Sequence, residues 1–296
     1  MDINFIRKFS IVFLGIIWIG SISFASAENQ SPSEESQNSI QIKGSDTMVN
    51  LGQAWAEAFM HKYPQAFVAV TGGGSGTGIS ALLSDTCDIA ETSRKMKQKE
   101  LDEAQKKGIE PIELTVALDG LAVVVNPKNP VNQLTIDELA DIFTGKIKNW
   151  KEVGGTNAPI VILSREVNSG THVYFKEHVL HKGNEKGPEE FDEGALLMPS
   201  SQAIADEITQ NPDAIGYYGM GYSNPTQKIL AIAKDKNGPY LAPTIDDVKN
   251  GTYYISRPLL MYTNGQPTGL IKDFIDFVLS AEGQEIVKQI DFVPIN

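Results

Sequence analysis

The sequence predicts an α/β fold in which short strands alternate with helices. β-rich runs at residues 40–43 and 67–70 are each followed by apolar residues at helical spacing, which is typical of βαβ connections. A continuous apolar run at residues 121–125 predicts a buried strand. The chain has 296 residues, 41% of them hydrophobic and 21% charged. This ordinary globular composition suits one large or two medium-sized domains.

The N-terminus has the parts of a secretory signal peptide. Arg7 and Lys8 precede an apolar run at residues 11–24, and residues 25–27 (ASA) supply the small side chains of a cleavage site. The alternative is a membrane anchor, but the run is shorter than the roughly 20 residues of a span. We therefore expect a signal peptide over residues 1–27. The polar residues 28–39 predict a disordered leader.

A helix follows the first predicted strand, because Leu51, Trp55 and Phe59 recur every four residues. Pro64 should end that helix. The second predicted strand then leads through a glycine-rich loop into a helix that carries Ile79.

The remaining elements continue the same alternation. Thr135 and Glu138 form a capping box at the start of a helix, and Gly145 should end it. Residues 160–163 predict another strand, and Phe274 lies on a late amphipathic helix.

Three of the predicted strand–helix connections are rich in glycine and hydroxyl side chains. They are residues 44–47 (GSDT), 72–78 (GGGSGTG) and 164–171 (SREVNSGT). The first turn of a helix has free N–H groups and partial positive charge, so each loop could bind an anion at the carboxyl edge of the sheet. The alternative is that these hydroxyls are plain N-caps. The glycine-rich loop has the spacing of neither a P-loop nor a dinucleotide fingerprint.

Two arginines near these loops could hold a tetrahedral oxyanion. Arg165 lies inside the third loop, and Arg94 lies between the second and third loops, in the segment 92–94 (TSR). A guanidinium presents a planar fork to such an anion; the alternative for each residue is a surface salt bridge.

Composition excludes several other classes of function. The formal net charge of −12 argues against nucleic acid as a partner. Cys87 is the single cysteine, so a disulfide and a Cys-rich zinc site are excluded. His178 and His181 lie one helical turn apart, but no known metal spacing supports them. We expect no cofactor and no metal.

Several motifs resemble those of the periplasmic phosphate-binding proteins of phosphate ABC transporters, and the resemblance covers residues 40–296. The most specific motif is residues 164–171, because R-x-x-x-S-G-T is that family's main oxyanion grip. The other motifs are residues 44–47, 72–78, 87–94 (CDIAETSR), 121–130 (LAVVVNPKNP), 142–155 (IFTGKIKNWKEVGG), 215–222 (IGYYGMGY) and 257–262 (RPLLMY).

The resemblance implies a two-lobed periplasmic binding protein of the type II-like class, with two crossing hinge strands at residues 121–125 and 257–262. Lobe I would comprise residues 40–120 and 257–296, and lobe II residues 121–256. It further implies a periplasmic, non-enzymatic monomer that binds inorganic phosphate between the lobes and delivers it to a membrane ABC permease. By position, the implied phosphate donors are Ser45, Thr47 and Ser75 on lobe I and Arg165, Ser169, Gly170 and Thr171 on lobe II.

The chain departs from the family pattern at one position. Some members carry a cleft aspartate that accepts a hydrogen bond from protonated phosphate, whereas this chain has Ser93 followed by Arg94. Either Asp46 or the hydroxyl oxygens could accept that proton here, and Arg94 would add positive charge in place of the aspartate. Other oxyanions, such as sulfate or molybdate, and a secreted phosphohydrolase stay as alternatives.

Overall fold

The computed structural model describes residues 38–184 and 186–296. The predicted signal peptide and most of the predicted leader lie outside these residues. The end of the leader prediction is wrong, because Ser39 begins strand β1 and pairs with Phe67. The backbone carbonyl of Asn38 also accepts a hydrogen bond from the Phe67 N–H, at 2.8 Å. A neighbouring parallel strand thus orders two polar residues that have no apolar side chain to bury.

A strongly curved sheet runs through the whole molecule. Its first strands are parallel to one another, and β11 and β4 are antiparallel to their neighbours at the centre. A separate pair of strands, β5 and β10, lies in the second half of the chain. In spatial order the sheet contains β2 (Phe67–Thr71), β1 (Ser39–Gly44), β3 (Ile89–Thr92), β11 (Ser256–Asn264), β4 (Pro111–Val125), β8 (Ala214–Gly219), β6 (Val161–Arg165) and β7 (Leu196–Met198), with β9 (Lys228–Ile229) beside β4; the pair is β5 (Gln133–Thr135) and β10 (Ala231–Ala233).

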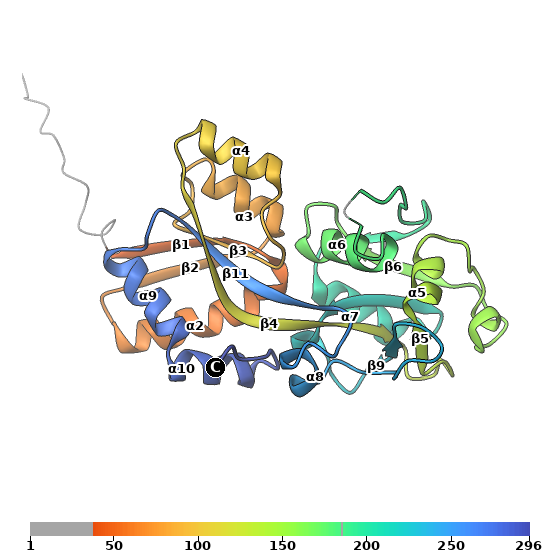
Figure 1. Cartoon of the computed structure of the whole chain (residues 1–296). Coiled ribbons are helices and arrows are strands. Elements are labelled where there is room, and N and C mark those ends of the chain that lie inside the picture. The colour runs from red at the N-terminus through yellow and green to blue at the C-terminus, as the bar shows by residue number, and fades with distance from the viewer. Residues whose placement is uncertain (1–37, 185) are drawn as a thin grey trace, which may run out of the picture.

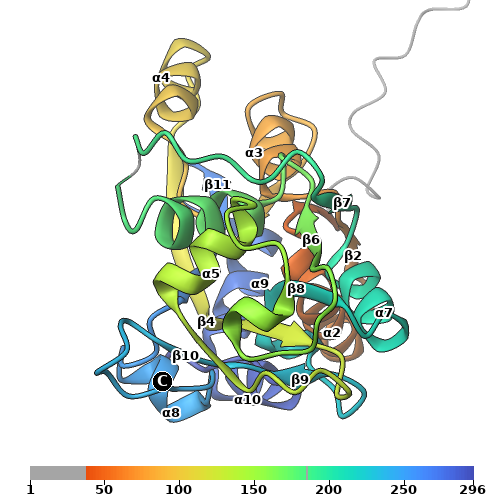
Figure 2. The ribbon, with the colours of Figure 1, turned by 90° about the vertical axis from the view of Figure 1, so that its right-hand side faces the viewer.

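Helices cover both halves of this sheet, and the two halves form two lobes joined by β4 and β11 (Figure 1). Around β1–β3 lie η1 (Asp46–Met48), α2 (Val49–Lys62), α3 (Ser75–Leu82), α4 (Gln98–Lys106), α9 (Gly269–Leu279) and α10 (Ala281–Gln289). Around β6 and β8 lie α5 (Ile136–Phe143), η2 (Trp150–Val153), α6 (Gly170–Phe175), η3 (Lys176–Leu180), α7 (Ser201–Gln210) and η4 (Met220–Tyr222), while α8 (Ile245–Lys249) packs near β4. Figure 2 looks onto this second lobe.

The long strand β4 connects the lobes by changing its partner along its length. Residues 111–120 pair with β11, and residues 121–125 pair with β8. β11 then returns the chain to the first lobe (Figure 1). The two-lobed α/β prediction with two crossing strands is confirmed. Both strands are longer than the ranges expected for them, because β-pairing continues through polar residues such as Asp119 and Thr263.

Each lobe has an aromatic centre. In the first lobe, Trp55, Phe59 and Phe274 are fully buried, and the indole N–H of Trp55 donates to the Gly283 carbonyl at 2.8 Å. In the second, the rings of Phe175 and Tyr217 stack with their centroids 3.8 Å apart. Burying each such side chain stabilises the fold by roughly 1.5–3 kcal/mol, so these clusters set the shape of the lobes that carry the loops.

The predicted capping box and the predicted helix-ending glycine are both present in the structure. Thr135 Oγ1 accepts from the Glu138 N–H at 3.2 Å, and Glu138 Oε2 accepts from the Thr135 N–H at 2.9 Å. Gly145 follows α5 with a φ of 72°, a left-handed conformation that favours glycine. The helix after the third loop is not α-helical throughout, because α6 continues into the wider π-helical turn η3.

Candidate functional site

The three glycine- and hydroxyl-rich loops meet where the two lobes touch. Two come from the carboxyl ends of β1 and β2 in the first lobe, and the third follows β6 in the second lobe. Thr47 Oγ1 lies 2.8 Å from Thr171 Oγ1 across the lobe boundary. The carboxyl ends of the parallel strands β1 and β2 share one edge of the sheet, and the loop after β6 meets them from the second lobe.

Four hydroxyl side chains form the centre of the site, and each is at least 99% buried. They are Thr47, Ser75, Ser93 and Thr171. Ser75 Oγ accepts from the Ser93 N–H at 3.0 Å and lies 3.3 Å from Ser93 Oγ. A hydroxyl can both donate and accept, so this cluster can adjust to an oxyanion in more than one protonation state.

Gly170 permits the close contact between the lobes at this cluster. A Cβ atom at Gly170 would lie 2.2 Å from Ser75 Oγ and 2.6 Å from Ser93 Oγ. Both separations are far below ordinary contact distances, so a larger residue would force the lobes apart. Glycine is required here by space, because its φ is not left-handed.

Ser169 and Ser45 precede helices beside the cluster, and only the side chain of Ser169 caps its helix. The Ser169 hydroxyl caps α6 by accepting from the N–H groups of Thr171 and His172, at 3.2 and 3.4 Å. Ser45 precedes η1, and its own N–H donates to the Glu91 carbonyl at 2.7 Å. Ser169 therefore acts as an N-cap in this structure, and the α6 N-terminus points its partial positive charge into the site.

Arg165 is 1% exposed, and protein groups hold its guanidinium. Its terminal nitrogens donate to Ser201 Oγ at 2.9 Å and to the Pro199 carbonyl at 3.0 Å. Asp46 Oδ2 lies 3.1 Å from the same guanidinium and bridges from the other lobe. Burial lowers the pKa of Arg165, and the Asp46 carboxylate opposes that shift. Contacts from both lobes thus fix the orientation of the planar Arg165 guanidinium.

Asp46 also links the lobes through two further groups. Its Oδ2 accepts from the Ser201 N–H at 2.8 Å, and its carbonyl accepts from the Tyr222 hydroxyl at 2.7 Å. Its Oδ1 accepts no hydrogen bond from any residue that the structure describes.

The hydrogen bonds of the Arg94 guanidinium go to residues outside the hydroxyl cluster. Its two terminal nitrogens donate to Glu100 at 2.8 and 2.7 Å, and one also reaches the Lys95 carbonyl at 2.9 Å. Its Nε is buried and has no hydrogen-bond partner within the described part of the chain. The structure thus brings the other predicted residues to the lobe boundary and engages Arg94 in a bidentate ion pair.

A buried ion pair that the sequence analysis missed lies directly beneath the cluster. Arg257 donates from Nη2 and Nε to Asp119 Oδ2, at 2.8 and 3.0 Å, on adjacent positions of β11 and β4. Arg257 Nη2 also lies 3.0 Å from Thr171 Oγ1 and 3.4 Å from Thr47 Oγ1. Burial raises the pKa of Asp119, while Arg257 opposes the rise. The available signal was a charged residue, Asp119 or Arg257, beside the apolar stretch of each strand.

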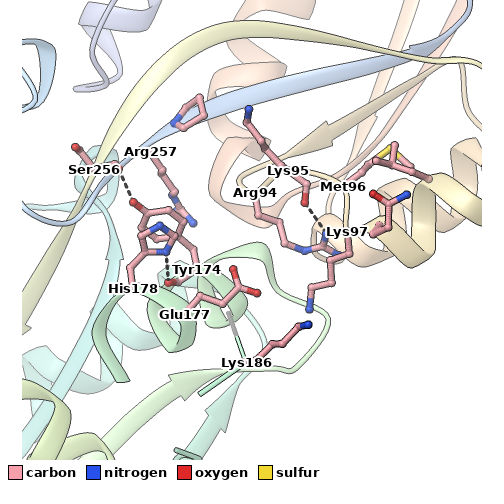
Figure 3. Close-up of a pocket in the computed structure, with 13 residues that line it drawn as sticks. Arg94, Lys95, Met96, Lys97, Tyr174, Glu177, His178, Lys186, Ser256 and Arg257 are labelled. Atoms are coloured by element: carbon pink, nitrogen blue, oxygen red, sulfur yellow. Dashed lines mark hydrogen bonds between the residues drawn. The ribbon is translucent and has the colours of Figure 1, made fainter. Parts of the chain in front are cut away.

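A pocket of about 750 Å³ opens between the lobes beside this ion pair (Figure 3). Arg257 belongs both to the pocket wall and to the hydroxyl cluster. The wall is formed by Arg94, Lys95, Met96, Lys97, Gln98, Leu101, Tyr174, Glu177, His178, Lys186, Ser256, Arg257 and Pro258.

The described residues contain neither a metal-binding group of three or more His, Cys, Asp or Glu side chains nor a helix long and apolar enough to cross a membrane. His178 instead stacks on Tyr174, with ring centroids 3.8 Å apart. The nearby His181 directs Nε2 to the Glu189 carbonyl at 2.7 Å.

The fold and the site define an interlobe anion-binding protein, and comparison with known families gives the same class. The chain belongs to the family of the periplasmic binding protein (PBP) superfamily domain, whose model matches residues 29–282.

Relatives within this family carry more specific names. The phosphate-binding protein PstS of Pseudomonas aeruginosa is 33% identical over 294 residues, covering 94% of this chain and 89% of the relative. The phosphate-binding protein PstS of Bacillus subtilis is also 33% identical, covering 93% and 87%. A solved phosphate ABC transporter substrate-binding protein with bound phosphate, from Clostridium perfringens, is 34% identical with a TM-score of 0.78, covering 88% of this chain and all of that one. Two of these relatives are named as phosphate-binding proteins, and the third is named as the substrate-binding protein of a phosphate ABC transporter.

Proposed function

We propose that this protein binds inorganic phosphate between its lobes and delivers it to a membrane ABC permease. The observation that carries the proposal is the buried cluster of four hydroxyls beside Arg257, at the boundary of two lobes. The named relatives, two of them one-third identical over nearly the whole chain, support the same ligand and the same transport role.

The proposed site recognises the anion mainly through neutral donors. Hydroxyls of Thr47, Ser75, Ser93 and Thr171 would donate, together with the N–H groups of the α6 N-terminus at Gly170. Arg257 would add a charge-assisted hydrogen bond, which is about twice as strong as a neutral one. The surrounding carboxylates weaken this attraction little, because fixed dipoles about 3 Å from the anion outweigh charges that solvent screens.

The proposed donors Thr47, Ser75, Ser93, Gly170 and Thr171 are among the site residues that the sequence predicted, and Arg257 is added. Of the other predicted residues, Ser169 caps α6, Ser45 lies in the loop before η1, Arg165 and Asp46 align the lobes, and Arg94 lines the pocket as an ion pair with Glu100. The proposed lobes comprise residues 40–120 with 257–296, and residues 121–256. Because donors come from both lobes, phosphate would favour the form in which they meet, and the permease would recognise that form.

Selectivity for phosphate over sulfate requires an acceptor for the phosphate proton, which sulfate lacks. Asp46 is the proposed carboxylate for this role, since its Oδ1 accepts no hydrogen bond among the described residues. The hydroxyl oxygens are the alternative acceptors. Asp46→Asn should reduce the preference for phosphate over sulfate if the carboxylate accepts the proton, whereas unchanged selectivity would favour the hydroxyls.

We further propose that the protein is exported to the periplasm, acts as a monomer and does not turn over phosphate esters. The apolar run before residues 25–27 supports export. Purified protein should leave an aryl phosphate unhydrolysed, and N-terminal sequencing of the exported chain should begin at Glu28.

Calorimetric titration of the ligand-stripped protein with phosphate, and separately with sulfate, tests the central proposal. Tight one-to-one binding of phosphate with no sulfate heat is the expected result. Sulfate binding without phosphate binding would keep the anion site but contradict the ligand. Heat from neither anion, with an intact circular dichroism spectrum, would contradict the whole proposal.

A further inference from the structure

The pocket beside the hydroxyl cluster is built from both lobes and from the hinge. Residues 94–98 line it from the first lobe, while Tyr174 and His178 line it from the second (Figure 3). Arg257, on hinge strand β11, completes the wall. At about 750 Å³ the pocket falls within the size range of small-molecule sites.

The wall of this pocket is cationic although the whole chain carries a net charge of −12. Arg94 and Arg257 have carboxylate partners in Glu100 and Asp119. Lys95 lies 3.5 Å from Glu113 but is 72% exposed, so solvent weakens that pair. The remaining lining cations are Lys97 and Lys186, and the lining carboxylate is Glu177.

One buried side chain connects the pocket to the proposed phosphate site. Arg257 lines the pocket, and its Nη2 lies 3.0 Å from Thr171 Oγ1 in the cluster. Arg94 is 8% exposed, borders the same pocket, and has a buried Nε with no acceptor among the described residues.

We propose that this pocket is an outer anion site, which captures phosphate before the ion passes Arg257 and reaches the hydroxyl cluster. The proposal rests on the proposed function and adds a route and a kinetic role for Lys95 and Lys97. These two lysines attract the incoming dianion and are not part of the final binding shell.

The physical basis is electrostatic steering by a charged cleft. A cleft lined by one sign of charge raises association rates by about 10- to 1,000-fold. Solvent-exposed charges act over a Debye length of about 10 Å at 0.1 M salt and about 3 Å at 1 M. The contribution of the lysines should therefore appear in the association rate at low salt and fade at high salt.

The test compares two double variants that change the net charge equally. Lys95→Gln/Lys97→Gln removes the pocket lysines, and Lys99→Gln/Lys106→Gln removes exposed lysines on α4 that do not line the pocket. Calorimetry gives the dissociation constant for inorganic phosphate. Release into excess of a fluorescent phosphate sensor gives the dissociation rate, and the ratio of the two gives the association rate.

The expected result is an association rate reduced by about fivefold or more at low salt in the pocket variant, with the dissociation rate within about twofold of wild type. In 0.5 M salt the difference should nearly vanish. Equal association rates in the two double variants would overturn the outer site while leaving phosphate binding intact. Absence of phosphate binding by the wild-type protein would overturn the proposed function and the outer site together.

Discussion

Arg165 touches both lobes through a single side chain, and its orientation is set by Asp46, Ser201 and the Pro199 carbonyl. A guanidinium can thus contribute to a binding site by fixing the relative position of the two lobes that form it. A lysine could carry the charge but not the planar fork.

Arg165→Ala should weaken phosphate binding by more than tenfold, and Arg165→Lys should restore only part of the loss. The reason is that a hydrogen bond to a charged group contributes about 1.5–3 kcal/mol, and its removal leaves the Asp46 carboxylate without its ion-pair partner at the lobe boundary. Calorimetric titration measures both variants. Superimposable titration curves for Arg165→Ala and wild type would exclude Arg165 from the site.

His172, on α6 behind the site, should make stability sensitive to acid. Burial lowers the pKa of His172 to about 4 from its usual 6.5. The unfolded chain therefore takes up a proton between pH 6.5 and pH 4 while the folded chain does not, so the free energy of unfolding falls as the pH falls through this window. At about 1.36 kcal/mol per pKa unit, the loss reaches up to about 3 kcal/mol.

Urea unfolding between pH 7 and pH 4 checks this prediction. His172→Asn should flatten the pH dependence in that window, whereas His61→Asn, a change at an exposed position on α2, should keep the wild-type slope. Identical slopes for His172→Asn and wild type would show that His172 is not the group responsible.

Helix α6 carries the second lobe's share of the site at its first residues. Ser169 caps the helix, Gly170 makes room for the other lobe, and Thr171 reaches Thr47. A short segment thus combines a cap, a close approach and a hydroxyl contact, which explains why its sequence is the most specific motif of the chain.

Gly170→Ala should leave the protein folded but reduce phosphate affinity by at least tenfold. Alanine suits a helix, so the melting temperature should change little. The added methyl would collide with Ser75 and Ser93, and the lobes could then meet only after both side chains moved. Thermal unfolding and calorimetry separate the two effects. Wild-type affinity would show that the lobes tolerate a wider spacing.

Contacts at the edge of the cleft couple the two lobes in the whole molecule. Asn168 Nδ2 donates to the Gly73 carbonyl at 2.7 Å, and the Asn168 carbonyl accepts from the Gly76 N–H at 3.0 Å. These bonds exist only when the lobes touch, so they stabilise the meeting of the lobes without contacting the proposed ligand.

Asn168→Ala should weaken phosphate binding by about threefold and raise the dissociation rate by a similar factor, because it removes the partly solvated hydrogen bonds from Asn168 Nδ2 to the Gly73 carbonyl and to Thr77 Oγ1. Asn237→Ala, at an exposed position remote from the lobe boundary, is the matched control and should behave as wild type. Small-angle scattering with and without phosphate should show a smaller compaction for Asn168→Ala. Equal compaction of the two variants would contradict the coupling.

The site was predictable where its signal is local. Loops such as residues 72–78 can be recognised from their glycine and hydroxyl content. Close approach of the backbone to a ligand and the capping of a helix both depend on residues that are neighbours in the chain. Arg257 was not predictable in this way. Its contact with Thr171 joins residues 86 positions apart. The sequence of its strand does not distinguish it from other buried strands, and the contact forms only when the second lobe is in place.

The sequence by itself determined the α/β alternation, the helix caps and the three anion-type loops, since each depends on spacing over a few residues. Only the tertiary structure decided which charges pair. It placed Arg165 on Asp46, Arg94 on Glu100 and Arg257 on Asp119. Pairing of buried charges depends on which groups lose water together. The pairing of β4 with β11 decides this for Arg257 and Asp119, and the contact between the lobes decides it for Arg165 and Asp46.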